Sequence, residues 1–168
     1  GKRNVTRHAN IFAILFDIAD KQKQEKILKN VLENDEIPAI TTPYFNFFEL
    51  DVLCQMGKLT EVLDKIRSYW GGMLDLGAVT FWEEYDPSVP KEEQYDMYGD
   101  HFGKSLCHAW AASPIYFLAK YFAGLDLVNK DGVTYVLKPQ MQYFTDLDCT
   151  LPVGSDGTVR LAWDGECL

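Results

Sequence analysis

Cysteine pairs, long apolar runs and an excess of basic residues are all missing from this 168-residue sequence. Its four cysteines are far apart and form no C-x-x-C pair, so we expect buried thiols rather than a zinc site or a disulfide framework, and no metal or cofactor. No apolar run is long enough to cross a bilayer, and the basic start lacks the apolar core of a signal peptide, so we expect no membrane partner and leave the compartment unassigned. The cysteines are Cys54, Cys107, Cys149 and Cys167.

The charge balance is acidic, with 16 Lys and Arg against 25 Asp and Glu and a formal net charge of −9. Such a surface repels phosphate backbones, which excludes nucleic acid as a natural partner. Hydrophobic residues make up 47% of the chain and aromatic residues 14%, so the composition is that of a folded domain with a real core.

The most informative stretch is residues 77–86, which read GAVTFWEEYD and place acids beside aromatic rings. A carboxylate between large rings loses part of its hydration, which is how proteins prepare a Glu for acid–base chemistry. The stretch opens a segment, residues 87–103, with no apolar period, and long connections inside a domain are often functional. The alternative is a surface loop whose Trp and Phe fill the core while its acids face water.

The first three quarters of the chain have apolar residues at helical spacing, which predicts two antiparallel helical hairpins. Thr42 and Thr60 are expected to cap the third and fourth helices, and Gly57 to end the third. A last long helix is expected after the loop, either kinked at Pro114 or begun afresh with Ser113 as its cap. The predicted helices cover about 11–18, 27–32, 43–56, 60–70 and 104–122.

From Asp131 the apolar period changes to two, which predicts strands over 133–137, 147–153 and 159–163. The turn sequence GSDG at 154–157 joins the last two as a hairpin. The fold class is therefore mainly α, followed by a short antiparallel β region. We place the domain boundary between residues 126 and 127, with a helical domain at 1–126 and a β region at 127–168.

Four motifs give the chain a family resemblance: TPYF at 42–45, SYWGGM at 68–73, GAVTFWE at 77–83 and SLCHAW at 105–110. In this order they resemble the C-terminal half of the catalytic domain of bacterial α-L-rhamnosidases, glycoside hydrolase family 78. The resemblance implies about half of an (α/α)6 toroid (a six-hairpin glycosidase fold), followed by the start of a C-terminal β-sandwich. It also implies a rhamnose-containing glycan or glycoside as the partner.

The resemblance also implies site residues. The general base of an inverting hydrolase falls on Glu83, with Glu84 as the nearest competitor, and a sugar-contacting histidine falls on His108. Trp82 and Tyr44 are candidates for an aromatic wall that receives the apolar side of a 6-deoxy sugar.

Other rings and histidines are left in structural roles. Aromatic residues at helical spacing more often belong to the core, and we assign Trp70 and Phe45 to it. His8 and His101 are given no role.

The sequence departs from the family because the Arg-Asp-Glu-Arg-type motif that carries the general acid does not occur in it, nor do the substrate-binding Asp residues around that motif. It also supplies only about half of the six helical hairpins of the toroid. We therefore expect a fragment that contributes the general base, hydrolyses no rhamnoside alone, and self-associates through uncovered helix faces. Two alternatives stay open: a non-catalytic carbohydrate-binding module, and a helical module that docks a protein.

Overall fold

The computed structural model describes residues 4–129 and 134–166, which form two compact units, 1–113 and 114–168. We describe each unit by itself and call them unit 1 and unit 2. The domain boundary expected between residues 126 and 127 stays a prediction, because the compact units of a chain need not coincide with the domains of a larger enzyme. None of the described helices combines the length and the apolar character that crossing a membrane requires.

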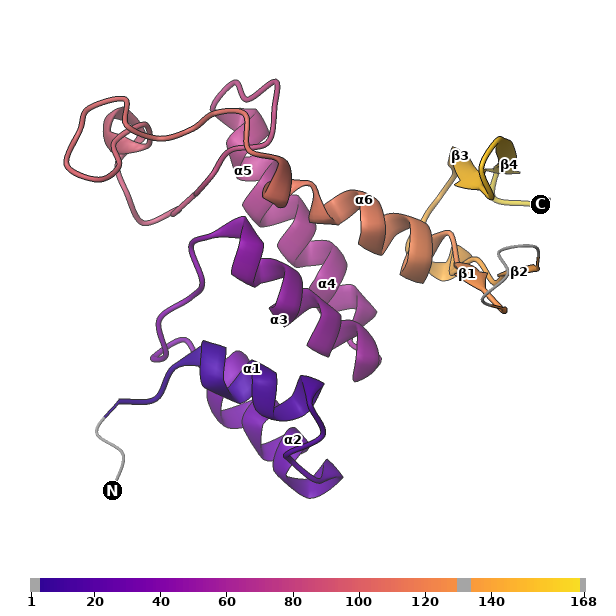
Figure 1. Cartoon of the computed structure of the whole chain (residues 1–168), viewed down its shortest axis with the longest axis horizontal. Helices are drawn as coiled ribbons and strands as arrows, with labels where there is room; N and C mark the ends of the chain where they lie inside the picture. Colours follow the sequence, from indigo (N-terminus) through magenta and orange to yellow (C-terminus); the bar gives the residue numbers. More distant parts are fainter. Residues whose placement is uncertain (1–3, 130–133, 167–168) are drawn as a thin grey trace. The chain divides into compact units, whose positions relative to one another are not determined.

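Unit 1 begins with a pair of helices, α1 (Arg7–Leu15) and α2 (Lys21–Ile27), and α2 continues into the π-helical turn η1 (Leu28–Leu32) (Figure 1). The second helix starts six residues before the start predicted at residue 27. The reason is a cap: the Asp20 carboxylate accepts a hydrogen bond from the Lys23 N–H at 2.9 Å. A capped and exposed first turn needs no apolar residues.

A second set of helices follows in unit 1. Its first member, α3, ends at a glycine, as predicted. Gly57 has a φ of 74°, and the next residue, Lys58, donates its N–H to the Leu53 carbonyl at 2.8 Å. Thr42 is the N-cap residue of α3, although its side chain makes no capping hydrogen bond, whereas Thr60 lies inside the next helix and was wrongly predicted as its cap. The elements are α3 (Pro43–Gln55), α4 (Leu59–Lys65), the π-helical turn η2 (Ile66–Trp70) and α5 (Gly71–Asp75).

Helix α3 forms the centre of unit 1, where it packs against α1 and α4. Its side chains are buried on several faces, and Leu50 and Val52 are completely covered. Trp70 is also buried, as expected for a core residue, and its indole N–H donates to the Ala111 carbonyl at 2.8 Å. The helices of unit 1 therefore share one core around α3.

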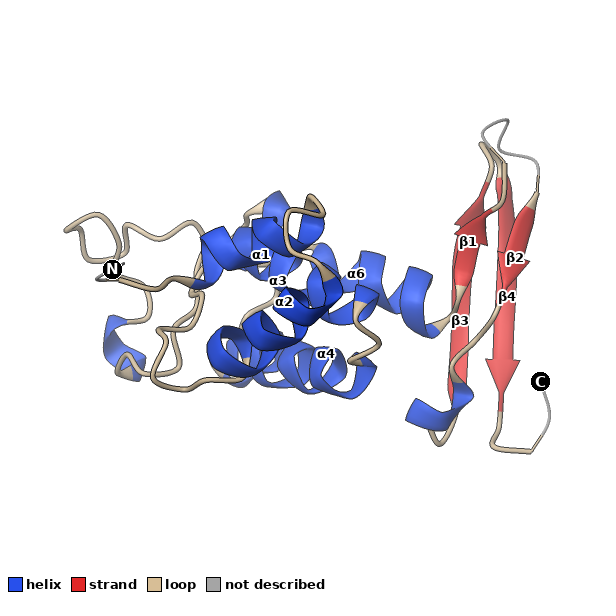
Figure 2. Ribbon diagram, turned by 90° about the horizontal axis from the view of Figure 1, so that it is seen from below, coloured by secondary structure: helices blue, strands red, loops and turns tan. Residues whose placement is uncertain are grey.

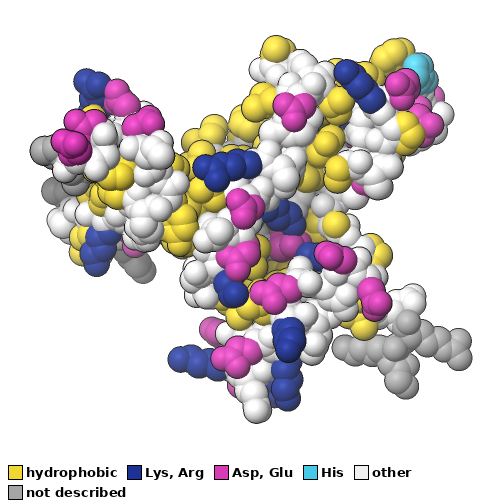
Figure 3. All heavy atoms as spheres, turned by 180° about the vertical axis from the view of Figure 1, so that it is seen from behind, with side chains coloured by type: hydrophobic (Ala, Val, Ile, Leu, Met, Phe, Trp, Pro, Cys, Tyr) yellow, Lys and Arg dark blue, Asp and Glu magenta, His cyan; other side chains and the backbone are white. Residues whose placement is uncertain are grey.

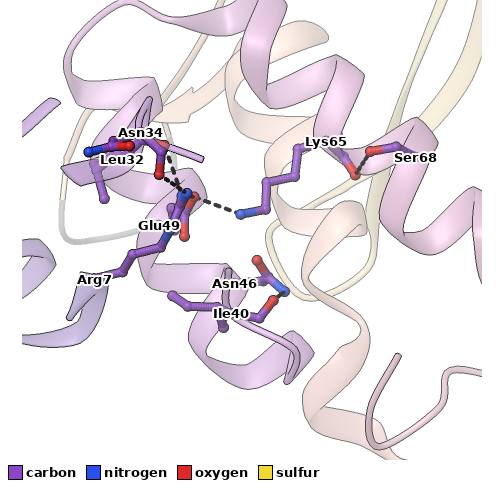
Figure 4. A network of polar contacts seen from close by, with 8 residues as sticks. All are labelled: Arg7, Leu32, Asn34, Ile40, Asn46, Glu49, Lys65 and Ser68. Atoms are coloured by element: carbon purple, nitrogen blue, oxygen red, sulfur yellow. Dashed lines mark hydrogen bonds and ion pairs between the residues drawn. The ribbon is translucent and has the colours of Figure 1, made fainter. Parts of the chain in front are cut away.

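A buried charge network links α1, α3 and α4 (Figure 4). Glu49 Oε1 accepts hydrogen bonds from Arg7 Nη1 at 2.8 Å and from Lys65 Nζ at 2.7 Å. Arg7 Nη1 also donates to the Leu32 carbonyl at 2.8 Å. Burial lowers the pKa of the Lys65 ammonium, while the charge of Glu49 acts in the opposite direction. The network fixes how three helices meet, because each charge needs the others in a water-poor interior.

The segment between α5 and α6 has little regular structure, in agreement with its lack of an apolar period. It contains only two short 3-10 turns among its described residues, η3 (Lys91–Glu93) and η4 (Ala109–Ala111). Gln94 is 2% exposed and holds the loop from inside, since its Nε2 donates to the Asp86 carbonyl at 2.6 Å and to the Val89 carbonyl at 2.8 Å. The loop is thus organised by side-chain hydrogen bonds to its own backbone.

The long helix predicted over residues 104–122 is wrong in its first half. A new helix, α6 (Ser113–Phe117), begins here, as the second of the two predicted possibilities has it, and continues as the π-helical turn η5 (Leu118–Phe122). The prediction of Ser113 as its cap was wrong, because Ser113 is the first helical residue and its buried hydroxyl has no hydrogen-bond partner among the described residues. Residues 104–108 are not helical. Pro114 near the helix start explains the boundary, because proline is suited to a first turn and not to a helix interior.

The described residues of unit 2 form four strands in two antiparallel two-stranded sheets. The strands are drawn in red in Figure 2. The predicted hairpin of the last two strands is confirmed, with Cys149 opposite Leu161 in the register. One strand was not predicted because it has only three residues, and the predicted start at Asp131 and Val133 lies outside the described residues. The elements are β1 (Leu125–Leu127), β2 (Tyr135–Leu137), the 3-10 turn η6 (Met141–Tyr143), β3 (Leu147–Val153) and β4 (Gly157–Trp163).

The mainly helical fold with a short antiparallel β region is therefore confirmed. The core of unit 2 joins Ala123 to Leu151 and Leu161, one from each strand of the β3–β4 hairpin. The prediction of buried thiols holds for Cys54, whereas Cys107 is exposed.

Gly124 is expected to be the least replaceable glycine of unit 2. Its φ is 72°, and a Cβ there would overlap the carbonyl group of Lys138, whose N–H bonds the Gly124 carbonyl at 2.9 Å. We expect Gly124→Ala to lower the free energy of unfolding by well over about 1 kcal/mol, measured by urea denaturation followed by circular dichroism. Gly154→Ala is the matched control, because its φ is 61° but nothing lies within 4 Å of its Cβ position. Equal losses in the two variants would contradict the steric argument.

Candidate active site

Two segments of unit 1 that are far apart in the sequence run beside each other and form the base of the site. The Glu83 N–H donates to the Ser105 carbonyl at 2.9 Å, and the His108 N–H donates to the Phe81 carbonyl at 2.8 Å. The Thr80 hydroxyl donates to the Leu106 carbonyl as well. These bonds clamp residues 80–83 against 105–108, and they bring together two site residues that are 25 positions apart.

The Glu83 carboxylate lies at the centre of this clamp and is 7% exposed. Its Oε1 accepts a hydrogen bond from the Tyr98 hydroxyl at 3.0 Å, and its Oε2 accepts one from the Ser105 N–H at 3.1 Å. His108 Nδ1 lies 3.9 Å from Oε2, beyond hydrogen-bond distance but close enough for both groups to face one small molecule. A carboxylate has about four lone-pair positions, so Glu83 can accept further hydrogen bonds besides these two.

A row of exposed rings continues from the imidazole. The His108 and Trp110 ring centroids are 4.2 Å apart, and the Trp110 and Tyr44 centroids are 5.3 Å apart. Tyr44 and Trp110 are 45% and 44% exposed. Aromatic faces open to solvent beside polar groups are a common receptor for the apolar face of a sugar.

Trp82 lies in a different environment from the other aromatic candidates. Its side chain is 3% exposed and packs against Tyr95, with ring centroids 5.6 Å apart. Its covered ring supports the segment that carries Glu83 from inside. Substrate binding by Trp82 stays a prediction, and the exposed Trp110 offers a more accessible ring.

The Glu84 carboxylate has a different hydrogen-bond partner from those of Glu83. Its Oε1 accepts a hydrogen bond from the Thr41 hydroxyl at 2.8 Å. The backbone beside it is also tied to that residue, since the Tyr85 N–H donates to the Thr41 carbonyl at 3.1 Å. The two adjacent glutamates are thus separated by their neighbours, and only Glu83 lies next to His108.

One buried cation contributes to the charge of this region. Lys104 is 8% exposed, and burial lowers the pKa of its ammonium, while the charges of Glu84 and Asp86 act in the opposite direction. Its positive charge offsets part of the repulsion between the clustered carboxylates. The part of the chain that the structure describes contains no group of His, Cys, Asp and Glu arranged to hold a metal ion.

A cleft of about 570 Å³ lies elsewhere on unit 1 and does not include Glu83. It is a separate feature of the surface and is not part of the site described above. Its walls come from the connector before α3, from α4 and η2, and from the start of the long loop: Pro38, Ala39, Ile40, Thr41, Lys65, Ser68, Tyr69, Asp86, Pro87 and Ser88.

Sequence reasoning missed two members of the site. Tyr98 lies in a loop without any periodic pattern, and its only signal was the following Gly99, which is typical of a tight turn. Trp110 was assigned to the face of a helix that does not extend that far. The roles of Glu83, His108, Trp82 and Tyr44 stay predictions, although Glu83 and His108 are neighbours in the structure.

Comparison with known proteins gives matches among solved structures. The rhamnosidase from Klebsiella oxytoca with rhamnose bound is 34% identical, with a TM-score of 0.62, over 71% of this chain and 23% of that chain. The family 78 rhamnosidase of Bacillus sp. GL1 is 26% identical, with a TM-score of 0.77, over 96% of this chain and 17% of that chain. No protein-family model and no curated protein matches the sequence.

By its fold and its similarities the chain is thus a glycoside hydrolase-like polypeptide. The resemblance to rhamnosidases of glycoside hydrolase family 78 is confirmed, since one match covers 96% of the chain. The chain spans 23% and 17% of the lengths of the two enzymes, so it corresponds to a part of them.

Proposed function

We propose that this chain is the base-bearing part of an inverting α-L-rhamnosidase that removes terminal α-L-rhamnose from glycosides or polysaccharides. The observation that carries the proposal is the Glu83 carboxylate, buried, held at both oxygens and 3.9 Å from His108. Similarity to two rhamnosidases, one of them described with rhamnose bound, supports rhamnose as the sugar.

In the proposed reaction, Glu83 accepts a proton from a water molecule as the water oxygen attacks the anomeric carbon. The bond to the leaving group breaks on the opposite face, where a general acid protonates the departing oxygen. The two carboxyl groups of inverting enzymes stand roughly 6.5–9.5 Å apart to leave room for the water. Glu84 is engaged by Thr41, so we assign the acid to polypeptide outside residues 1–168.

We assign sugar recognition to the groups next to Glu83. The His108 imidazole offers a hydrogen bond to a ring hydroxyl. The exposed rings of Trp110 and Tyr44 form an apolar surface for the methyl group of a 6-deoxy sugar. In this assignment Trp82 supports Glu83 from inside the fold.

The architecture of unit 1 supports the same proposal. Unit 1 consists of helix pairs joined by short turns, and its helix α3 is buried on several faces. About half of an (α/α)6 toroid would have this arrangement. Such a half leaves apolar side chains uncovered, and Figure 3 shows hydrophobic groups exposed between charged ones. Self-association through this surface stays a prediction. Exposed apolar side chains of unit 1 include Phe16, Ile18, Leu74, Val79 and Phe102.

The 168-residue chain alone is expected not to release rhamnose from an aryl α-L-rhamnoside, whereas a complete catalytic domain that contains it releases rhamnose with inversion. The reason is the missing general acid. Product appearance is measured by proton NMR, which also reports the anomeric configuration, and light scattering on the same sample measures self-association. Release by the isolated chain would contradict the assignment of the acid, and a compact monomer at high concentration would contradict self-association.

The same samples test the alternative of a carbohydrate-binding module. Rhamnose is titrated against tryptophan fluorescence, to which Trp110 contributes because it is exposed beside His108. Rhamnose binding by a complete catalytic domain that shows no hydrolysis would favour the binding module over the enzyme.

A further inference from the structure

Tyr98 is delivered by a tight turn with an unusual backbone. The Met97 N–H donates to the Asp100 carbonyl at 3.1 Å, and the Asp100 N–H donates to the Met97 carbonyl at 3.0 Å. Between them Tyr98 has a φ of 56° and Gly99 a φ of 84°. Turns with two left-handed central residues favour Gly, Asn and Asp, so a tyrosine in the first position is uncommon.

The position of the Tyr98 ring shows that it is not there to fill the core. The residue is 79% exposed, yet its hydroxyl reaches Glu83 Oε1 at 3.0 Å, on a residue that is only 7% exposed. A strained backbone that persists without burial of the side chain points to a function of the side chain's polar end. In Tyr98 that polar end is the hydroxyl group, which donates a hydrogen bond to Glu83.

The contact fixes the orientation of the carboxylate. The Ser105 N–H holds Oε2 from the clamped backbone, and the Tyr98 hydroxyl holds Oε1 from the loop. Two donors on different oxygens prevent rotation of the carboxylate plane, and a general base depends on holding a fixed angle to the water that it deprotonates.

We propose that Tyr98 is a positioning residue for the Glu83 carboxylate, an inference that rests on the proposed role of Glu83 as the general base. Tyr98 acts as a neutral donor and does not touch the reacting atoms. The hydrogen bond to Glu83 raises the pKa of the Tyr98 phenol, so the donor proton is retained over the whole neutral range. The loop thereby contributes to catalysis through a single hydroxyl group.

The first test compares two hydroxyl deletions in the complete enzyme that contains this chain. Tyr98→Phe is expected to lower kcat by about ten- to a hundredfold, the worth of a hydrogen bond to a charged group, with KM unchanged. Tyr95→Phe is the matched control, because it removes the same hydroxyl oxygen from a tyrosine of the same loop. Within the described ranges the Tyr95 hydroxyl makes no hydrogen bond. This variant is expected to change neither constant.

The second test observes the contact directly in the 168-residue chain. With tyrosine labelled at Cζ, carbon NMR gives the titration midpoint of Tyr98, assigned through the Tyr98→Phe spectrum. Glu83→Gln is expected to move this midpoint down towards the ordinary tyrosine value. Glu84→Gln is expected to move it much less, because Glu84 acts on Tyr98 only through its charge and makes no hydrogen bond to it. An unchanged midpoint in Glu83→Gln overturns the proposal.

The outcomes separate this inference from the proposed function. A wild-type enzyme that does not release rhamnose overturns the proposed function and this inference with it. A working enzyme whose Tyr98→Phe variant keeps its kcat overturns this inference alone. A fall in kcat at constant KM in Tyr98→Phe, absent from Tyr95→Phe, supports it.

Discussion

Glu83→Gln is expected to lower the rate of rhamnoside hydrolysis by about 10²- to 10⁴-fold in a complete enzyme that contains this chain, the range that a general base contributes. Glutamine has the shape of glutamate and can still accept from Ser105 or Tyr98, but it cannot take a proton from water. The loss should therefore fall on kcat, while the affinity for the sugar is retained. Initial rates on an aryl α-L-rhamnoside over a range of concentrations measure both constants.

The adjacent residue supplies the control for this experiment. Glu84→Gln changes the same functional group one position along the chain, where the carboxylate is bound by the Thr41 hydroxyl. We expect a much smaller loss from it, caused only by a weaker contact to the connector before α3. If Glu84→Gln abolished turnover while Glu83→Gln kept it, the assignment of the base would have to be exchanged between the two residues.

Glu49→Gln is expected to cause the largest loss of stability, about 3–5 kcal/mol in the free energy of unfolding. Glu49 is 2% exposed, and one of its oxygens accepts from both Arg7 and Lys65. Removing its charge leaves the buried Arg7 and the partly buried Lys65 without a counterion, which costs far more than the loss of a surface ion pair. Urea denaturation followed by tryptophan fluorescence measures the change.

Two comparisons make the stability experiment specific. Glu33→Gln removes an exposed partner of Lys58 and is expected to cost less than about 1 kcal/mol. A triple replacement of Arg7, Glu49 and Lys65 by Met, Leu and Met removes the whole network and is expected to recover most of the loss. If Glu49→Gln cost no more than Glu33→Gln, the network would not be what holds α1, α3 and α4 together.

Much of the fold could be predicted because it depends on local patterns. Gly57 ends α3 through its own left-handed backbone, and the hairpin of β3 and β4 follows from alternation and a strong turn sequence. The first turns of α2 could not be predicted from apolar spacing, since that helix starts at the Asp20 cap and is exposed. In the same way, residues 105–108 were included in the expected helix because of Leu106, but their backbone pairs with that of Phe81 and Glu83 instead.

The candidate site also contains residues that local sequence patterns predict and residues that they do not. Glu83 and His108 could be named from short motifs, because each lies within a recognisable string of residues. Tyr98 could not, since its contact with Glu83 arises from closure of a loop without periodic pattern. Trp110 ends the same motif as His108, and it was missed because it fell within the helix expected over 104–122. Long-range contacts of this kind leave no trace in the spacing of a single sequence.

The clamp between residues 80–83 and 105–108 has a consequence for how freely the segment between them can vary in length. Because backbone bonds join the two ends of the intervening excursion, its length is decoupled from the register of Glu83 and His108. Doubling the length of a closed loop costs only about 0.6 kcal/mol in chain entropy. Insertions and deletions in this excursion can therefore be accommodated while Glu83 and His108 keep their spacing.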